Sequence, residues 1–402
     1  MINTITNRTL KKGFYITLTS GILFGVLLIY LIFLYKPNYY ETNITSKDIP
    51  ITSATRNTMR IYGDNFFETS AAISRFAYPA TFSDNRPNAI ILVREDRKED
   101  AILAAQLIKY PINAPILYTY KDSIPNTILR EMKRLSPQGV VLDRNSKVYL
   151  IGDLGNGVKD EVVKLGWNFR ELKGNDTYEL SKNIDDYIAA YKGSHNDKVV
   201  VAPIEASDYA LMETAWSAHS GDVFFFIKKD SIPDKVAEAL KFRRGGAYIY
   251  VLGDDSVISP KVQSELSKYG HVQRISDAND IYTQAIDFTR YRDVGKNFSW
   301  WFGRKTTEFG WNIEKSGHNF IFATLDDWHL PAASAVLAYK SEHGPILFVK
   351  KSSIPAVVQK YLSDIRPMDV SVQEKMNNYG VIIGSKDFID ENIQGQLDEL
   401  LS

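Results

Sequence analysis

Short, mostly apolar runs alternate with amphipathic stretches along most of this chain. Residues 89–93 (AIILV) and 115–118 (PILY) are two such runs, and residues 147–151 (KVYLI) are a third. Between the first two, residues 100–110 carry apolar side chains at helical spacing. The runs predict buried strands, and the spaced stretch predicts a helix. Because strands that alternate with helices pair in parallel, the pattern predicts an α/β fold.

This order of elements occurs three times. The second set of strands is expected at 198–202, 223–227 and 248–253, and the third at 319–323, 345–349 and 381–384. A pentapeptide follows the second strand of every set: KDSIP at 121–125 and 229–233, and KSSIP at 351–355. Such recurrence indicates repeated units. Proline suits the first turn of a helix, so we expect the pentapeptide to lead each strand into a helix, with the N-cap at Ser123 or a near neighbour.

The N-terminal segment has a different pattern. Residues 13–35 contain no charged side chain, and about 20 apolar residues suffice to cross a bilayer as a helix. Arg8, Lys11 and Lys12 precede the segment, which places the N-terminus in the cytoplasm by the positive-inside rule. The alternative is a cleaved signal peptide, but the segment ends in bulky residues at 34–37 and offers no small-residue cleavage site. We therefore predict an uncleaved, single-pass anchor in the cell membrane, with the rest of the chain outside the cytoplasm.

A second repeated element opens each unit with an arginine and continues into a polar turn and a helix start; the three arginines are Arg60, Arg170 and Arg274. The predicted organisation is a cytoplasmic tail at 1–12, a transmembrane anchor at 13–35, a linker at 36–59, and repeat domains at 60–169, 170–273 and 274–402. The third domain carries an aromatic insertion at 297–318.

Composition narrows the function. The chain has 402 residues with 48 basic and 48 acidic side chains, a balance that argues against a nucleic-acid partner. It has no cysteine, which excludes disulfides, thiolate zinc sites and thiol nucleophiles. The six histidines show no metal-binding spacing, and no nucleotide-binding or nucleophile motif is present. We expect no cofactor, no metal and no enzymatic activity.

The paired repeated elements resemble the cell wall binding repeat 2 family, which occurs as three tandem copies in bacterial surface proteins. In the first unit the matching residues are Arg60, Gly63, Phe67, Thr69, Asp100, Ala101, residues 115–117, Ser123, Pro125 and residues 149–152. The resemblance covers residues 60 to about 400. It depends on the same motifs occurring in the same order in all three units, and not on any one motif. It implies three small α/β domains, Rossmann/Toprim-like, around a pseudo-threefold axis, and noncovalent attachment to an anionic wall polymer. The family arginine of the Asp-Arg-Tyr run is replaced by Phe66, Thr177 and Ile281.

Two sets of charged residues are candidate polymer contacts. Asp100, Asp208 and Asp327 each follow the first strand of a unit, where α/β sheets bind ligands. The alternative role for these carboxylates is helix N-capping, which we favour. The arginines at 60, 170 and 274 are suited to phosphates or uronates, and equally to salt bridges between the units.

The aromatic insertion is the third candidate. Trp300, Trp301 and Trp311 lie in it beside Arg304 and Lys305, a combination suited to carbohydrate or to a membrane interface. The alternative is packing of a long loop onto its own domain.

The resulting hypothesis is a membrane-anchored, non-enzymatic protein that engages an anionic cell-wall polymer or an envelope protein outside the cytoplasm. Two alternatives stay open: a membrane-tethered enzyme acting on envelope polysaccharide, and a protein-interaction scaffold in an envelope complex.

Overall fold

The computed structural model describes residues 54–109, 111–294, 308–367 and 376–402, together with Gly25 and Tyr30. The chain divides into two compact units, residues 1–52 and residues 53–402. No helix within the described part of the chain is long and apolar enough to span a bilayer. Apart from Gly25 and Tyr30, the predicted anchor at 13–35 lies outside the described residues.

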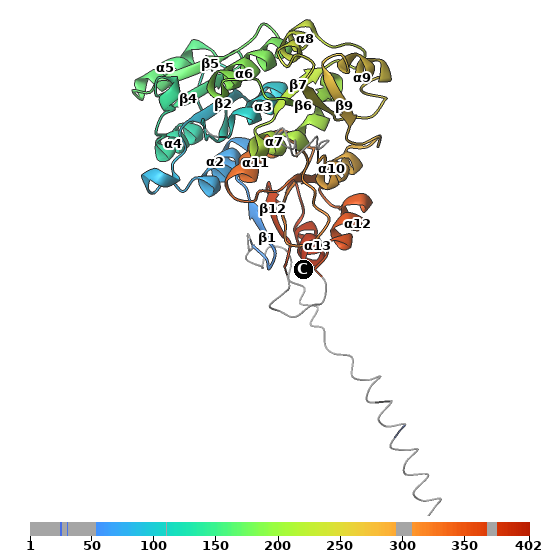
Figure 1. The fold of residues 1–402 in the computed structure, drawn as a ribbon. Helices are drawn as coiled ribbons and strands as arrows, with labels where there is room; N and C mark the ends of the chain where they lie inside the picture. The colour runs from blue at the N-terminus through green and yellow to red at the C-terminus, as the bar shows by residue number, and fades with distance from the viewer. Residues whose placement is uncertain (1–24, 26–29, 31–53, 110, 295–307, 368–375) are drawn as a thin grey trace, which may run out of the picture. The chain divides into compact units, whose positions relative to one another are not determined.

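Residues 53–402 contain three sheets, each of four parallel strands (Figure 1). The first has the order β3-β2-β4-β5, with β2 Ile90–Arg94, β3 Ile116–Thr119, β4 Val148–Ile151 and β5 Phe169–Leu172. The second has the order β7-β6-β8-β9, with β6 Lys198–Pro203, β7 Val223–Ile227, β8 Ala247–Val251 and β9 Gly270–Arg274. The third has the order β1-β12-β10-β11, with β1 Thr58–Ile61, β10 Asn319–Ala323, β11 Ile346–Phe348 and β12 Tyr379–Ile383. The prediction of three repeated α/β units is confirmed.

The third sheet joins the two ends of the described chain. β1 pairs in parallel with β12, from Thr58 opposite Gly380 to Ile61 opposite Ile383. β1 therefore begins inside the range predicted as linker. In all three sheets the fourth strand leads into a helix that packs against the next unit: β5 into α6 (Thr177–Lys192), β9 into α10 (Ile281–Arg290) and β1 into α2 (Phe66–Ala77). The three units thus form a closed cycle.

The starts of these three helices are locally encoded. The side chains of Asn65, Asp176 and Asp280 accept hydrogen bonds from backbone N–H groups three residues later, at 3.0, 2.8 and 2.9 Å. Each is an N-cap, a role for which Asn and Asp are strongly preferred. The repeated element that opens each predicted unit is therefore a strand, a turn and a capped helix.

Helices that follow the first strand of each sheet meet at the centre of the molecule. They are α3 (Lys98–Ala104, continued by a 3-10 turn at Ala105–Leu107), α7 (Leu211–Ser220, preceded by a 3-10 segment at Ile204–Ala210) and α11 (His329–Lys340). Nine consecutive residues of α11, from Leu330 to Ala338, are buried. A helix that is apolar on every side belongs in a core, and α11 packs against α7, α3 and α2.

The remaining helices cover the sheets from outside. α4 (Asn126–Leu135), α8 (Asp234–Lys241) and α12 (Ala356–Asp364) follow the second strands, whereas α5 (Asn156–Lys164), α9 (Pro260–Leu266) and α13 (Glu391–Leu401) follow the third. The described chain also has 3-10 turns at Ser83–Asn85 and Val141–Asp143.

The pentapeptide connects these two sets of outer helices. The carbonyls of Lys121, Lys229 and Lys351 accept hydrogen bonds from the backbone N–H groups of Gly155, Ser259 and Asp390, at 2.8, 3.0 and 2.8 Å. Those three donors are the residues just before α5, α9 and α13. The proline of each pentapeptide is the N-cap residue of α4, α8 or α12, so the N-cap of α4 lies two residues after Ser123.

Candidate functional site

Arg60 is a buried structural residue. It stands on β1 opposite Ile382, and its Nη1 donates to the carbonyl of Gly384 at 2.9 Å. Its Nε donates to Gln394 Oε1 on α13 at 3.0 Å. The residue is 5 % exposed, and desolvation lowers the pKa of its guanidinium. Arg60 thus fastens β1 to the end of β12, and little of it is accessible from outside.

Arg274 repeats this arrangement in the second sheet. It stands on β9 opposite Val251, and its Nη1 donates to the carbonyl of Gly253. Its Nε donates to Gln263 on α9 at 3.2 Å, and Nη2 lies 2.9 Å from Asp255 Oδ1. The guanidinium is again committed to the end of a strand and the following helix.

The register separates Arg170 from the other two arginines. In the first sheet Glu171, and not Arg170, stands opposite Leu150, the position equivalent to Ile382 and Val251. Glu171 pairs at 2.7 Å with Lys159 on α5, which occupies the place of the two glutamines. The predicted equivalence of the three arginines is therefore off by one residue in this unit. Arg170 instead pairs with the buried Asp143.

Asp100 is buried and does not cap its helix. α3 begins at Lys98 with Arg97 as the N-cap residue, so the aspartate is the third residue of the helix. Its carboxylate lies 3.2 Å from Arg97 Nε, and burial raises its pKa. It also packs closely on the turn after β4: a Cβ added at Gly152 (φ +81°) would lie only 2.3 Å from Asp100 Oδ2. The predicted N-capping role is wrong for this residue.

Asp208 and Asp327 have different surroundings from Asp100 and from each other. Asp208 is exposed in the segment before α7 and pairs with Lys98 of the first unit at 2.7 Å, so it is not a helix cap either. Asp327 Oδ1 accepts the backbone N–H of His329 at 3.0 Å and lies 2.5 Å from His329 Nδ1. It holds the first turn of α11. The structure does not bring the three carboxylates together into one site.

His329 lies in an aromatic junction between the first and third units. Its ring stacks on Phe66 at 3.9 Å and on Trp328 at 3.7 Å, and Tyr118 Oη donates to its carbonyl at 2.7 Å. Its Nε2 lies 2.7 Å from the carbonyl of Glu95. Phe66 is one of the three positions at which the family arginine is replaced. Here the replacement joins two units by ring stacking.

The described end of the aromatic insertion packs on the second unit. Phe309 is 1 % exposed and stacks on Tyr250 at 3.5 Å, while Trp311 lies 5.2 Å from Trp216 and 5.0 Å from His219. This part of the insertion packs on its own domain, where Phe309 also stacks on Phe288 of α10 at 5.9 Å, and the same rings fill the junction with the second unit. Trp300 and Trp301 lie outside the described residues.

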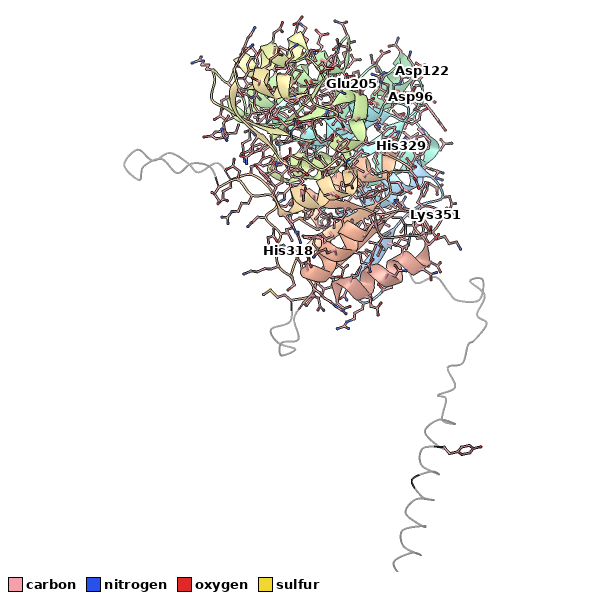
Figure 2. The ribbon with its side chains drawn as sticks, turned by 90° about the vertical axis from the view of Figure 1, so that its right-hand side faces the viewer. Asp96, Asp122, Glu205, His318, His329 and Lys351 are labelled. Atoms are coloured by element: carbon pink, nitrogen blue, oxygen red, sulfur yellow. The ribbon has the colours of Figure 1, made fainter. Side chains whose placement is uncertain are left out.

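The rim lysines, Lys121, Lys229 and Lys351, are the charged groups that recur at one position in all three units. Each is exposed and follows the second strand of its sheet. Lys121 Nζ lies 3.8 Å from the exposed Asp153, whereas no described carboxylate pairs with the ammonium group of Lys229 or Lys351. Figure 2 marks Lys351 and, from the corresponding loop of the first unit, Asp122. Sequence reasoning missed these lysines because the serine and proline of the pentapeptide already had structural roles.

The residue before each rim lysine varies between units. Lys228 and Lys350 lie over the rings of Tyr178 and Tyr282 at 5.7 and 5.5 Å. In the first unit the equivalent residue is Tyr120, which packs edge-on against Phe67 at 5.1 Å. The second and third units therefore carry an additional exposed cation, and the first carries an aromatic surface.

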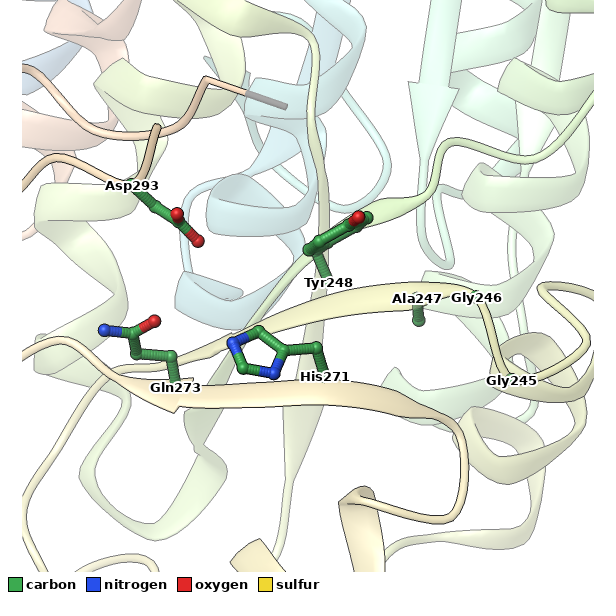
Figure 3. Close-up of a pocket in the computed structure, with 7 residues that line it drawn as sticks. All are labelled: Gly245, Gly246, Ala247, Tyr248, His271, Gln273 and Asp293. Atoms are coloured by element: carbon green, nitrogen blue, oxygen red, sulfur yellow. The ribbon is translucent and has the colours of Figure 1, made fainter. Parts of the chain in front are cut away.

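Three pockets occupy the same place in the three sheets, between the beginnings of the third and fourth strands. Their volumes are about 370 Å³ at β8 and β9, 360 Å³ at β12 and β1, and 330 Å³ at β4 and β5. In the first of these, Tyr248, His271, Gln273 and Asp293 converge on the pocket (Figure 3). The pocket recurs because the three sheets repeat the same strand order.

One cluster has the donor types of a metal site. Oxygen or nitrogen atoms of Asp185, Asp186 and His195 lie within 4.8 Å of one another. However, both oxygens of Asp185 are taken by Arg243, at 2.8 and 2.9 Å. The residues therefore fit a buried ion pair and not a cation site.

Comparison with known proteins places this fold in a family. Residues 60–163 and 171–263 match the model of Cell wall binding domain 2 (CWB2). Among curated proteins, the chain is 24 % identical over 311 residues to the amidase enhancer of Bacillus subtilis (strain 168), covering 76 % of this chain and 38 % of that protein. It is 23 % identical over 231 residues to the N-acetylmuramoyl-L-alanine amidase LytC of the same organism, covering 58 % and 42 %. The chain thus spans less than half the length of either relative.

Solved structures show the same fold. Cwp6 from Clostridium difficile superposes with a TM-score of 0.67 at 21 % identity, over 87 % of this chain and 49 % of that chain. Cwp8 from the same organism gives 0.66 at 20 %, over 86 % and 52 %. The second match to the family model begins at Glu171, the residue that the sheet register aligns with Arg60. The chain therefore belongs to the cell wall binding domain 2 family.

Proposed function

We propose that this protein binds an anionic glycopolymer of the cell wall without modifying it, and that the rim lysines supply the repeated contacts. The observation that carries the proposal is an exposed lysine at the same place in each of three linked units. Repeated weak contacts on one scaffold raise the overall affinity, because each contact after the first forms at a high effective concentration. A polymer with regularly spaced negative charges fits this arrangement.

The candidates Arg60, Arg274 and Arg170 have no part in this proposal. The first two bind backbone carbonyls at strand ends, and the third pairs with a buried carboxylate. The family arginine is absent at Phe66, Thr177 and Ile281, and the rim lysines are exposed cations that recur at one position in each unit. The proximity of Asp153 to Lys121 reduces the positive electrostatic potential around that lysine. Binding should therefore weaken with salt, but less steeply than for a purely basic groove.

Replacing the rim lysines tests the proposal. The variant Lys121→Gln/Lys229→Gln/Lys351→Gln should bind isolated cell walls about ten-fold more weakly, since exposed ion pairs contribute about 0.2–1 kcal/mol each. Sedimentation of the full-length protein with purified walls at low salt measures the affinity. The matched control is Lys133→Gln/Lys164→Gln/Lys241→Gln, which removes three exposed lysines at helix ends and changes the net charge equally. Equal losses in the two variants, or no loss in either, would contradict the proposal.

We also propose that residues 13–35 hold the protein in the cell membrane, with residues 53–402 on the outer side. The support is the uncharged apolar segment and the basic residues before it. The full-length chain should stay in the membrane fraction after alkaline carbonate washing, and external protease should degrade residues 53–402 in wall-stripped cells. Recovery of the chain in the carbonate supernatant, or protection from protease, would overturn the topology.

A further inference from the structure

We propose that a pocket between the first and second units binds an oxyanion, either a phosphate group or a carboxylate. The pocket has a volume of about 250 Å³ and lies where the end of α7 meets the end of α6 and the chain after α3. Lys109 and Lys192 line it on the polar side, and Ile112, Ile188 and Tyr191 on the apolar side. It is distinct from the rim lysines and from the three pockets at the strand beginnings.

The two ammonium groups converge on one helix end. Lys109 Nζ donates to the carbonyls of His219 and Ser220 at 2.6 and 2.9 Å, and Lys192 Nζ donates to the carbonyl of Gly221 at 3.0 Å. An ammonium group has three donors. One donor of Lys109 and two of Lys192 therefore have no partner among the described residues. These donors are available to a ligand in the pocket.

The charges around the pocket do not balance. Lys198 is the third ammonium group nearby, and it lies 3.3 Å from Asp222 Oδ1. Asp185 is the other carboxylate near Lys192, but it is committed to Arg243. Desolvation lowers the pKa of Lys109 and of Lys192, and repulsion from neighbouring lysines adds to this effect. Attraction by Asp222 opposes it, at Lys192 more strongly than Lys198 acts. A bound oxyanion would offset this repulsion and accept the remaining N–H donors.

Capping of the C-terminal end of α7 does not by itself explain why Lys109, Lys192 and Lys198 all lie near it. The helix dipole places about half a negative charge at the helix end, which a single cation offsets. Gly221 also keeps the lysines close to the carbonyls: it has a φ of +74°, and a Cβ there would lie 3.1 Å from Lys109 Cδ. The excess cation, the unpaired donors and the cavity together point to a small anionic group.

Inorganic phosphate is the first probe. With the full-length protein in detergent, replacing chloride by phosphate at constant ionic strength should raise the Tm by several degrees, because a ligand that binds only the folded state stabilises it. Broadening of the ³¹P resonance of phosphate by the protein gives a second measurement. Lys109→Met/Lys192→Met should lose both effects, whereas Lys121→Gln/Lys229→Gln should keep them. If the double methionine variant unfolds, Lys192→Gln alone should weaken phosphate binding at least five-fold. Absence of any phosphate-specific effect on the wild type, or the same effect in every variant, would overturn the site.

The idea that the oxyanion belongs to a wall polymer rests on the proposed function. A second arm of the experiment distinguishes a polymer from a free oxyanion as the ligand. The ³¹P resonance of a soluble poly(glycerol phosphate) should broaden in the presence of the protein, and this polymer should compete with inorganic phosphate for the pocket. If phosphate binds but the polymer does not compete, the pocket is a site for a free oxyanion and the polymer source is overturned. The proposed function fails independently, when the rim-lysine variant retains wild-type affinity for walls.

Discussion

Replacing Arg243 by methionine is expected to destabilise the protein by about 3–5 kcal/mol, because it leaves a buried carboxylate without its counter-ion. The side chains of Arg243 and Asp185 are 0 % and 1 % exposed, and two hydrogen bonds of 2.9 and 2.8 Å join them. The pair fastens α6 to the end of α8, and α6 is the helix through which the first sheet connects to the second unit. Urea unfolding followed by circular dichroism measures the loss in the free energy of unfolding.

Two further variants make this result specific. Lys360→Met breaks an exposed pair with Asp364 and should cost less than about 1 kcal/mol. Arg243→Met/Asp185→Leu removes both buried charges and should recover part of the loss, since apolar replacements of a buried pair are often tolerated. A loss below about 1 kcal/mol in the single variant would show that Asp185 finds another partner, and His195 at 3.0 Å is the nearest one.

The local pattern of apolar and polar residues was enough to predict the strands and helices of each unit. The apolar runs at 89–93 and 198–202 correspond to β2 and β6 within one residue at each end, because a buried parallel strand needs a continuous apolar run. The closure of the cycle was not predictable in this way. β1 has only four residues, one of them an arginine, and its partner β12 lies near the other end of the chain. A local sequence pattern does not indicate which strands pair when they lie so far apart in the chain.

The candidate site was harder to predict than the fold. Arg170 and Glu171 are adjacent, so a repeat aligned by residue type selects the arginine, whereas the sheet register selects the glutamate. Asp100 follows a strand as an N-cap would, but α3 starts two residues earlier and buries it. Side-chain roles such as these depend on burial and register, and sequence spacing does not specify either.

The three junctions between units are built from different chemistry. The first and third units meet through stacked rings around His329, and the second and third through Phe309 and Trp311. Between the first and second, the side chain of Gln106 bonds both the N–H and the carbonyl of Phe224, at 2.9 and 3.2 Å. Because the junctions differ, the contacts of one junction are not available at another. A repeat protein with distinct junctions is protected against misassembly of similar units.

The interior of the central helix α7 carries a group that lowers stability at neutral pH. Glu213 is 0 % exposed, its Oε1 accepts from Ser217, and its Oε2 has no hydrogen-bond partner among the described residues. Burial raises the pKa of Glu213 well above its usual value. A carboxyl whose pKa is raised on folding contributes its full stability below the unfolded pKa of about 4.3, and the contribution is lost as the pH rises toward the folded pKa.

Glu213→Gln should therefore stabilise the protein at pH 8 by about 1–3 kcal/mol, because the amide is neutral at every pH and can donate where the carboxylate cannot. The gain should shrink as the pH falls from 8 to 5, since the free-energy cost of keeping the wild-type carboxyl protonated in the fold falls as the pH approaches the unfolded pKa. Thermal unfolding of both proteins across these pH values measures it. Glu238→Gln, an exposed change on α8, controls for the loss of one negative charge and should alter the Tm little at any pH. A variant that is less stable than wild type at pH 8, or a gain that does not change with pH, would mean that Glu213 is ionised in the fold and is stabilised by its surroundings.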